Sequence, residues 1–249
     1  MTEKEVFMDI RHTWLFTRPI AHRGLHNDKI PENSIGAFEN AIANDFPIEL
    51  DVRLIDDGTV VVFHDDKLAR MTNNDGYICN LKKEDLTTIT LGKTEEHIPT
   101  FEEVLRVING RVPLLIELKN EGKIGELEGK TLELLRNYEG EYAVQSFNPY
   151  SIEYFKNKAP EITRGILSCF FENASLSRLK KFALKRMLLN KMAKPDFVSY
   201  RHDNLPNKYV TKTKLPTLAW TINNNADMEK VIPHCDNIIF EGFIPKIEK

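Results

Sequence analysis

The chain has 249 residues, of which 41% are hydrophobic and 29% are charged, and its formal net charge is −3. This length suits one barrel of ordinary size or two small domains, and the weak acidic excess argues against a nucleic-acid-binding protein. No stretch is apolar enough to cross a bilayer and no signal peptide is evident, so we expect a cytoplasmic protein. Three dispersed cysteines without a CxxC pair also favour a reducing compartment.

Short apolar runs alternate with helical patterns along the chain. This alternation predicts parallel strands joined by crossover helices. Eight such units in this length favour a closed (β/α)8 TIM barrel over a doubly wound open sheet. We predict strands over residues 19–23, 48–54, 114–119, 142–147, 162–167, 197–200, 217–222 and 237–241, and helices over 34–43, 101–108, 125–137 and 149–158.

The stretch after the second predicted strand is too long for a simple βα connection. It begins with the turn signal Asp57-Gly58 and the β-rich residues 59–63, which predict a hairpin. We expect a small insertion over about 66–98 within one domain that spans 1–249. Few residues follow the eighth strand, so we expect the last helix to be short or missing, and residues 1–18 to cover that gap or the barrel bottom.

Residues 172–194 are unusually basic. They hold seven Lys or Arg residues and one acid, a net charge of +6, which leaves −9 for the rest of the chain. Leu176, Leu179, Ala183 and Met187 recur at helical spacing. We interpret the segment as a helix that faces the barrel and has a solvated basic side; the alternative is weak contact with anionic lipid headgroups at a membrane surface.

Acidic residues interrupt the second predicted strand. Because residues two apart on a strand share a face, Glu49 and Asp51 point one way and Leu50 and Val52 the other. The outer face of a barrel strand meets helices and should be apolar, so the two carboxylates are expected inside the barrel. Burying like charges is costly without compensation, and a divalent cation is the simplest compensation.

The third predicted strand repeats this pattern. Glu117 and Lys119 share one face, and Ile116 and Leu118 share the other. Three inward carboxylates without clustered histidine or thiolate indicate a hard cation, Mg²⁺ or Ca²⁺. The competing interpretation is a Glu117–Lys119 salt bridge beside a solvated acidic pair, which either strand alone would allow.

Two histidines lie near strand ends beside these acids. His22 ends the first predicted strand, and His64 follows the β-rich residues 59–63. A lone histidine is more often structural than catalytic. Two of them next to Arg23 and inward carboxylates favour proton transfer, for which the pKa of histidine is suited at neutral pH.

Taken together, these segments resemble the glycerophosphodiester phosphodiesterase family. Their order and approximate spacing fit from residue 20 to about residue 223. The matching segments are His22-Arg23-Gly24, Pro31-Glu32-Asn33-Ser34, Glu49-Leu50-Asp51-Val52, Asp57-Gly58, Val61-Val62-Phe63-His64-Asp65, Pro99-Thr100-Phe101, Ile116-Glu117-Leu118-Lys119, Ser146-Phe147 and Trp220-Thr221-Ile222-Asn223.

The resemblance implies a TIM barrel that cleaves small-molecule glycerophosphodiesters to glycerol 3-phosphate and an alcohol. In this sequence, His22 and His64 match the acid–base pair of the family. Glu49, Asp51 and Glu117 match its ligands for one divalent cation, which agrees with the reading of the strand faces.

The resemblance also implies a substrate pocket. Arg23 and Lys119 match residues that hold the phosphate, and Phe147 and Trp220 match aromatic positions that line the glycerol side. The eighth predicted strand departs from the family, which usually ends Asp-Gly-Ile-Ile-Thr-Asp, whereas residues 236–241 read Asp-Asn-Ile-Ile-Phe-Glu. This departure concerns the pocket wall and none of the proposed catalytic groups.

Three other functions remain open from the sequence. One is lysophospholipase-D-like cleavage of lysophospholipids at a membrane surface. Another is a non-catalytic phosphodiester-binding protein, and the last is a metal-dependent aldolase or isomerase. The leaving alcohol, the nucleophile, the choice between Mg²⁺ and Ca²⁺ and the oligomeric state are likewise open.

Overall fold

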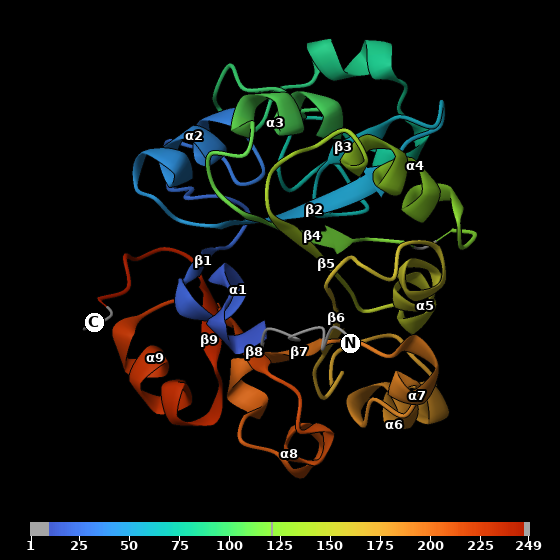
Figure 1. Ribbon diagram of the computed structural model, residues 1–249. Coiled ribbons are helices and arrows are strands. Elements are labelled where there is room, and N and C mark those ends of the chain that lie inside the picture. The colour runs from blue at the N-terminus through green and yellow to red at the C-terminus, as the bar shows by residue number, and fades with distance from the viewer. Residues whose placement is uncertain (1–9, 121, 247–249) are drawn as a thin grey trace, which may run out of the picture.

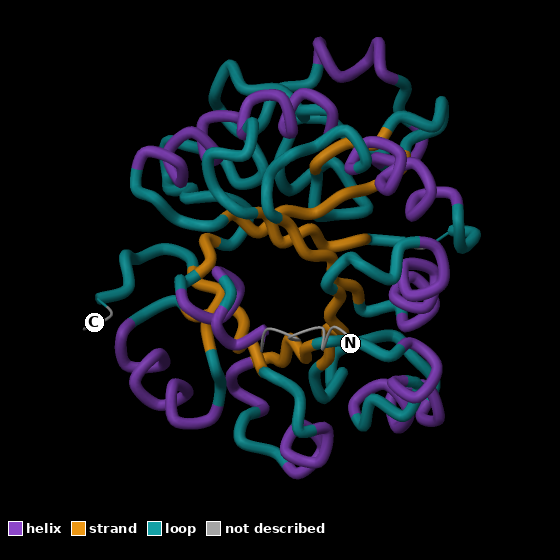
Figure 2. Tube along the Cα trace, in the orientation of Figure 1, coloured by secondary structure: helices purple, strands orange, loops and turns teal. Residues whose placement is uncertain are grey.

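Eight parallel strands close into a barrel at the centre of the molecule, as the ring of strands in Figure 2 shows. The structure, a computed structural model, describes residues 10–120 and 122–246. Within them, the barrel strands are β1 (Ile20–Ala21), β2 (Ile48–Leu54), β4 (Leu114–Leu118), β5 (Tyr142–Ser146), β6 (Arg164–Ser168), β7 (Phe197–Arg201), β8 (Thr217–Ile222) and β9 (Asn237–Phe240).

The barrel closes between the first and last strands. β1 pairs with β2 through Ala21 and Ile48, and with β9 through Ile20 and Ile239, and both pairings are parallel. The TIM barrel predicted from the sequence is therefore confirmed, and the open doubly wound sheet is excluded by this closure.

Helices surround the strands (Figure 1). Several begin at polar caps: Ser34 caps α2 by accepting from the amide of Ala37, and Thr100 and Glu103 form a capping box at α3. The outer helices are α2 (Ile35–Ala43), α3 (Phe101–Ile108), α4 (Glu126–Leu135), α5 (Pro149–Lys158), α6 (Arg178–Lys185), α7 (Asn190–Ala193), α8 (Lys208–Thr213) and α9 (Asn225–Val231), with short 3-10 turns η4 (His202–Asn204) and η5 (Ile232–His234).

Most predicted boundaries agree with the structure within one residue, but those of β1, β6 and α4 do not. β1 ends at Ala21 and not at residue 23. β6 begins at Arg164 and not at residue 162, because the amide of Ile162 still closes a turn onto the carbonyl of Ala159. α4 is shorter than the predicted 125–137: Gly125, with a left-handed φ of 102°, stands at its N-terminal cap, and the helix ends at Leu135. After β9, residues 241–246 contain no helix, as expected from the few residues left there.

The segment after β2 forms the predicted hairpin and insertion. β3 (Val60–Val62) pairs antiparallel with β2, and Gly58 turns the chain with a φ of 80°. Beyond it lie η2 (Ile78–Asn80) and η3 (Lys83–Thr88). The insertion has a small apolar cluster of its own, made by Ile55, Val61, Phe63, Leu68, Ile78, Leu86, Ile89, Leu91 and Ile98.

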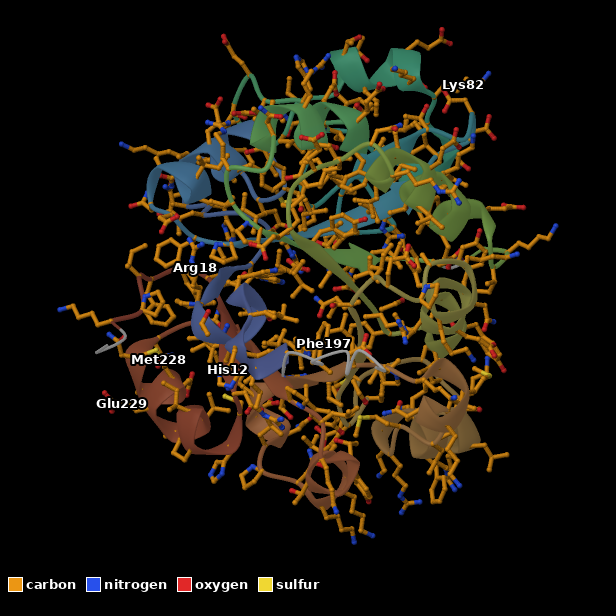
Figure 3. The ribbon with its side chains drawn as sticks, in the orientation of Figure 1. His12, Arg18, Lys82, Phe197, Met228 and Glu229 are labelled. Carbon is orange, nitrogen blue, oxygen red and sulfur yellow. The ribbon has the colours of Figure 1, made fainter. Side chains whose placement is uncertain are left out.

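The N-terminal segment covers one end of the barrel. It contains η1 (Ile10–His12) and α1 (Trp14–Thr17), and Leu15 and Phe16 of α1 are buried. The Phe16 ring lies 6.1 Å from that of Phe197, which Figure 3 labels, in a cluster with Ile20, Leu115, Ala143, Leu218 and Ile239. Most of these residues are the first or second of their strands, so α1 closes the bottom of the barrel. Of the predicted covering segment 1–18, residues 1–9 lie outside the described residues.

No helix in the described ranges combines the length and the hydropathy needed to span a lipid bilayer.

Candidate active site

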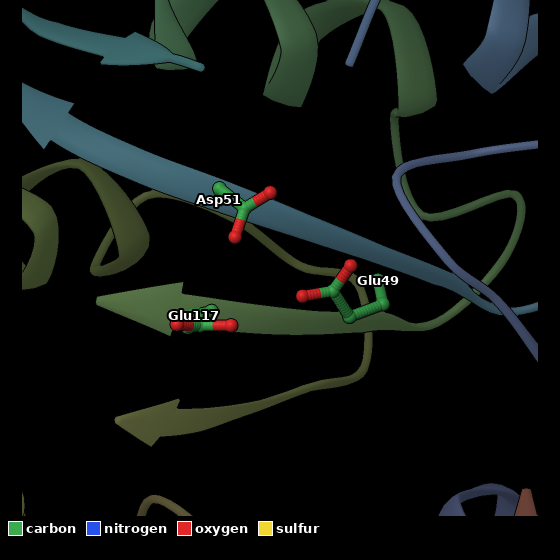
Figure 4. A group of neighbouring side chains, drawn as sticks. All are labelled: Glu49, Asp51 and Glu117. Carbon is green, nitrogen blue, oxygen red and sulfur yellow. The ribbon is translucent and has the colours of Figure 1, made fainter. Parts of the chain in front are cut away.

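Three carboxylates from neighbouring strands converge inside the barrel (Figure 4). Glu49 and Asp51 lie on β2, and Glu117 of β4 stands opposite Asp51 in the parallel register. Oxygen atoms of all three lie within 4.8 Å of one another, and all three residues are buried. Leu50 and Val52 pack outward in the main apolar core that also contains residues of α2 and α3. The alternation along β2 thus directs the acids inward.

Two cations partly compensate these acids. The Nζ atom of Lys119 is 2.6 Å from Glu117 Oε1 and 3.2 Å from Asp51 Oδ1. Arg23 Nε lies 3.4 Å from Asp51 Oδ2, and the backbone amide of Arg23 donates to Glu49 Oε2 at 3.0 Å. The Glu117–Lys119 salt bridge of the competing interpretation is therefore present, but Glu49 and Asp51 are buried and not solvated, and the salt bridge is part of a larger cluster of acids and basic residues.

The pKa values of the three carboxyls in the cluster shift in different directions. Burial, together with the charges of Asp51 and Glu117, raises the pKa of Glu49 well above its usual value. Burial also raises the pKa of Glu117, although Lys119 opposes this. The pKa of Asp51 is lowered despite its burial, because Lys119, His64 and Arg23 favour its ionised form. Glu49 therefore carries the uncompensated part of the charge.

The donor set fits a divalent cation. Carboxylate oxygens are the ligands of Mg²⁺ and Ca²⁺, at about 2.0–2.6 Å, so two ligands of one ion stand no more than about 5 Å apart. The 4.8 Å limit within the cluster agrees with this spacing. A cation here would also favour the ionised form of Glu49, whose pKa is raised by burial and by the charges of Asp51 and Glu117. The acidic cluster is thus compatible with the single divalent ion predicted from the sequence.

The segment after β1 positions Arg23 and Asp51. Arg23 Nη1 contacts Glu32 Oε1 at 2.6 Å, and the Asn33 side chain donates to Asp51 Oδ2 at 2.9 Å. Gly24 has a φ of 80°, and a Cβ there would come within 2.9 Å of the Ala37 backbone. Only glycine fits this approach without displacement. The Pro-Glu-Asn segment is therefore built into the site as a support for its charged groups.

His22 is held by the carboxylate of Glu241, the residue that follows the last strand, β9. Its Nδ1 atom lies 2.6 Å from Glu241 Oε2, and its Nε2 atom lies 4.0 Å from Glu49 Oε2. An ionised carboxylate only accepts, so Nδ1 carries the proton and Nε2 presents its lone pair. Burial lowers the pKa of His22, against the opposing effect of Glu241. Asn223 donates to the other oxygen of Glu241 at 2.8 Å.

His64 has the same arrangement with its neighbour. Its Nδ1 atom lies 2.7 Å from Asp65 Oδ1, and burial lowers the pKa of His64 to about 4, although Asp51 opposes this. Asp65 in turn contacts Arg70, which holds Glu32 at 2.6 Å and 2.9 Å. A charged chain therefore joins His64 to Glu32, the carboxylate that also holds Arg23.

An open cleft of about 930 Å³ contains part of this cluster. His64, Glu117, Lys119 and Phe147 line it, with Leu176 among the other lining residues. The Phe147 ring stands perpendicular to that of Trp220, with centroids 5.5 Å apart. A larger cavity, of about 1110 Å³, lies on the insertion side and is lined by none of the candidate residues. Of these two spaces, only the smaller cleft is lined by candidate residues.

Comparison with known proteins decides the family. The sequence model of the glycerophosphoryl diester phosphodiesterase family matches residues 22–238, which contain every predicted site residue. The chain belongs to this family. YhdW of Bacillus subtilis is 33% identical over 230 residues, which cover 85% of this chain and 88% of that protein. A glycerophosphodiester phosphodiesterase of Caldanaerobacter subterraneus subsp. tengcongensis is 30% identical, over 87% and 90% of the two chains.

Solved structures agree with this assignment. A phosphodiesterase of Oleispira antarctica, in complex with the product sn-glycerol-3-phosphate, superposes with a TM-score of 0.78 at 26% identity. The superposition covers 91% of this chain and 93% of that one. The predicted enzyme class, a glycerophosphodiester phosphodiesterase with a TIM barrel, is confirmed by these comparisons.

The groups that support the histidines were not predicted from the sequence. Glu241 was noted only as a departure from the family's usual strand ending and was not connected with His22. The available signal was an acid at the carboxyl end of the last barrel strand, where the catalytic groups of TIM barrels gather. Glu32, Asn33 and Asp65 belonged to the recognised segments but were given no role.

Proposed function

We propose that the chain hydrolyses glycerophosphodiesters to glycerol 3-phosphate and an alcohol, with one divalent cation and with His22 and His64 as its proton-transfer groups. The observation that carries this proposal is the convergence of three buried carboxylates with two histidines whose Nδ1 atoms are both fixed by acids. Glu49, Asp51 and Glu117 would hold the cation.

His22 serves the attacking side in this proposal. Its lowered pKa keeps the ring neutral at neutral pH, and Glu241 leaves Nε2 as the free acceptor. This nitrogen takes the proton from the attacking hydroxyl, whether that belongs to water or to the glycerol of the substrate. A cation held by Glu49, Asp51 and Glu117 would supply positive charge that stabilises the charge developing on the phosphoryl oxygens.

His64 serves the departing side. To act as an acid it must hold a proton on Nε2, whereas its pKa of about 4 makes the ring neutral in the substrate-free site. A bound phosphodiester brings negative charge beside the ring, which favours the protonated form. Arg23 and Lys119 would bind the phosphate, Arg23 by its planar, bidentate geometry.

The aromatic residues suggest which end of the substrate is selected. Phe147 and Trp220 would close over the glycerol, while the leaving alcohol projects towards the solvent near the insertion. Selectivity should then be strict for glycerol and loose for the alcohol. Hydrolysis of bis(p-nitrophenyl) phosphate, which lacks glycerol, is expected to be much slower than that of glycerophosphocholine. Comparable rates on both compounds would contradict this assignment.

The test of the proposed function is release of glycerol 3-phosphate from glycerophosphocholine by the purified chain. Activity should disappear with EDTA and return with Mg²⁺ or Ca²⁺. Glu49→Gln should lose metal binding and activity, whereas the matched substitution Glu133→Gln, at an exposed position on α4, should lose neither. Full activity after metal removal would contradict the metal requirement.

Lysophospholipid cleavage is a second candidate function. One observation favours it: the cleft that contains His64 continues along apolar side chains, including Phe171, Leu176, Leu184 and Leu189, which suit an acyl chain. Faster hydrolysis of lysophosphatidylcholine than of glycerophosphocholine would support it. A non-catalytic phosphodiester-binding protein would instead bind glycerophosphocholine and release no glycerol 3-phosphate under any metal condition.

A further inference from the structure

Helix α6 exposes apolar side chains to solvent. Leu179 is 82% exposed, Phe182 47% and Leu188, just beyond the helix, 52%. No residue of α6 is buried, although a helix in a barrel of this type ordinarily buries one face on the strands. The predicted helix that faces the barrel is therefore present only in part: Leu179 points to solvent, whereas Met187, just beyond α6, packs with residues of β6 and β7. Leu179 and Phe182 are three residues apart on one helix, and neighbouring exposed apolar side chains are a feature of surfaces that meet a protein or a membrane.

The same helix is strongly basic. The segment 172–194 carries a net charge of +6 in a chain whose total is −3. Within the described residues, none of its seven Lys and Arg side chains forms an ion pair with an acid. The Arg186 guanidinium instead lies 3.5 Å from the ring centroid of Phe182. Unpaired positive charge beside exposed Leu and Phe is the composition of helices that lie in the interface of a lipid bilayer.

The position of α6 links this surface to the active site. Lys180, Ala183 and Leu184 line the cleft that also contains His64 and Lys119. Leu179 is one helical turn from Ala183, so the exposed apolar group begins at the rim of the cleft. Figure 1 shows α6 and α7 together on the side of the barrel away from the insertion.

We propose that the α6 surface, made by Arg178, Leu179, Lys181, Phe182, Lys185, Arg186 and Leu188, binds the anionic surface of a lipid membrane. Its basic side chains meet the lipid phosphates, and Leu179, Phe182 and Leu188 enter the headgroup region. The chain then rests on the membrane with the cleft rim at the lipid surface. This inference goes beyond the proposed hydrolysis and does not depend on it, because it concerns binding alone.

The experiment is co-sedimentation of the full chain with vesicles of phosphatidylcholine alone and of equal parts phosphatidylcholine and phosphatidylglycerol. The chain should bind the anionic vesicles only, and less as the salt concentration rises. Each basic residue near an anionic surface contributes about fivefold, so the triple variant R178E/K181E/K185E should bind about a hundredfold more weakly. The apolar variant L179Q/F182Q should bind more weakly at every salt concentration.

A matched control separates this surface from net charge. K29E/K82E/K93E changes the charge by the same amount at exposed positions on the insertion side, where Figure 3 labels Lys82 far from α6. This control should bind at least tenfold more tightly than the α6 charge variant, since it leaves the local positive charge in place. Because none of the substituted α6 residues lines the cleft, hydrolysis of soluble glycerophosphocholine should be unchanged in both α6 variants.

Three results would overturn the proposal. One is equal binding to neutral and anionic vesicles, or to neither. Another is an equal loss of binding in the control and the α6 charge variant. The last is a self-association of the chain, detected by size-exclusion chromatography with light scattering, that L179Q/F182Q abolishes, since a second copy of the chain would then cover α6.

Discussion

A carboxylate fixes the Nδ1 atom of both His22 and His64. The two carboxylates differ in how far along the chain each lies from its histidine. Asp65 follows His64 directly, so a short segment of sequence contains the whole pair. Glu241 is 219 residues from His22, and only closure of the barrel brings them together. The local sequence was therefore enough to single out His22 and His64 as candidate residues. The carboxylate that holds His22 could be found only from the three-dimensional structure.

Glu241→Gln tests whether this contact positions His22. The amide keeps the shape of the side chain but removes the charge that fixes the proton on Nδ1. We expect kcat to fall about tenfold to a hundredfold, as for carboxylates that orient metal-bound histidines, with KM nearly unchanged. Glu229→Gln on α9, an exposed position labelled in Figure 3, is the control. A wild-type kcat in Glu241→Gln would mean that the hydrogen bond is only structural.

The two histidines should differ in their response to the leaving group. Attack and departure occur on opposite sides of phosphorus, so His22→Ala and His64→Ala should each cost about 10²–10⁴-fold in rate. A glycerophospho-p-nitrophenyl ester needs little protonation of its leaving group and should rescue only the variant that lacks the acid. We expect rescue of His64→Ala in stopped-flow or steady-state assays. Rescue of His22→Ala instead would exchange the two roles.

Among the secondary-structure elements, the strands can be predicted from the alternation of side chains along the sequence. The short helix α1 depends instead on tertiary contacts. β2 and β4 were predicted closely because their apolar positions and acids alternate with the period of a strand. The four residues of α1 are too few for a helix to be stable alone, so its packing under the barrel stabilises it. The sequence predicted only that this segment covers some part of the barrel.

Phe16→Ala should destabilise the fold without damaging the chemistry. Phe16 is 7% exposed and packs on Phe197, so its removal is expected to lower the free energy of unfolding by about 3–5 kcal/mol. Ile232→Ala, at a position that is 46% exposed, should change it by less than about 1 kcal/mol. Urea unfolding measures both. The kcat of the folded protein should be retained, since α1 lies at the end of the barrel opposite the acids.

For the whole molecule, protonation of the acidic cluster links stability to pH, and the binding of a cation by the cluster would be linked to both. Because the pKa of Glu49 is raised in the folded state, this residue stabilises the fold at low pH. That stabilisation is lost as the pH rises through the raised pKa. Asp51, whose pKa is lowered, stays ionised over this range and does not alter the comparison. The metal-free fold is thus least stable at the pH at which its carboxylates are ionised and can bind a cation.

Added Mg²⁺ or Ca²⁺ should therefore raise Tm more at about pH 8 than at about pH 5.5. A cation at a hundred times its Kd adds about 2.7 kcal/mol to the stability of the native state. Differential scanning fluorimetry of EDTA-treated protein, with and without added cation, measures both shifts. Glu49→Gln should show a smaller shift at each pH. Equal shifts at the two pH values would contradict a link between protonation and metal binding in this cluster.

Because β1 pairs with β9, the barrel can close only after the last strand has been synthesised. A ribosome completes His22, Arg23 and all three acids of the cluster well before Glu241 has been made. A nascent chain that lacks β9 has an open barrel wall and a histidine without its carboxylate. We therefore expect a copy of the chain that ends before β9 to be inactive, although it carries Glu49, Asp51 and Glu117.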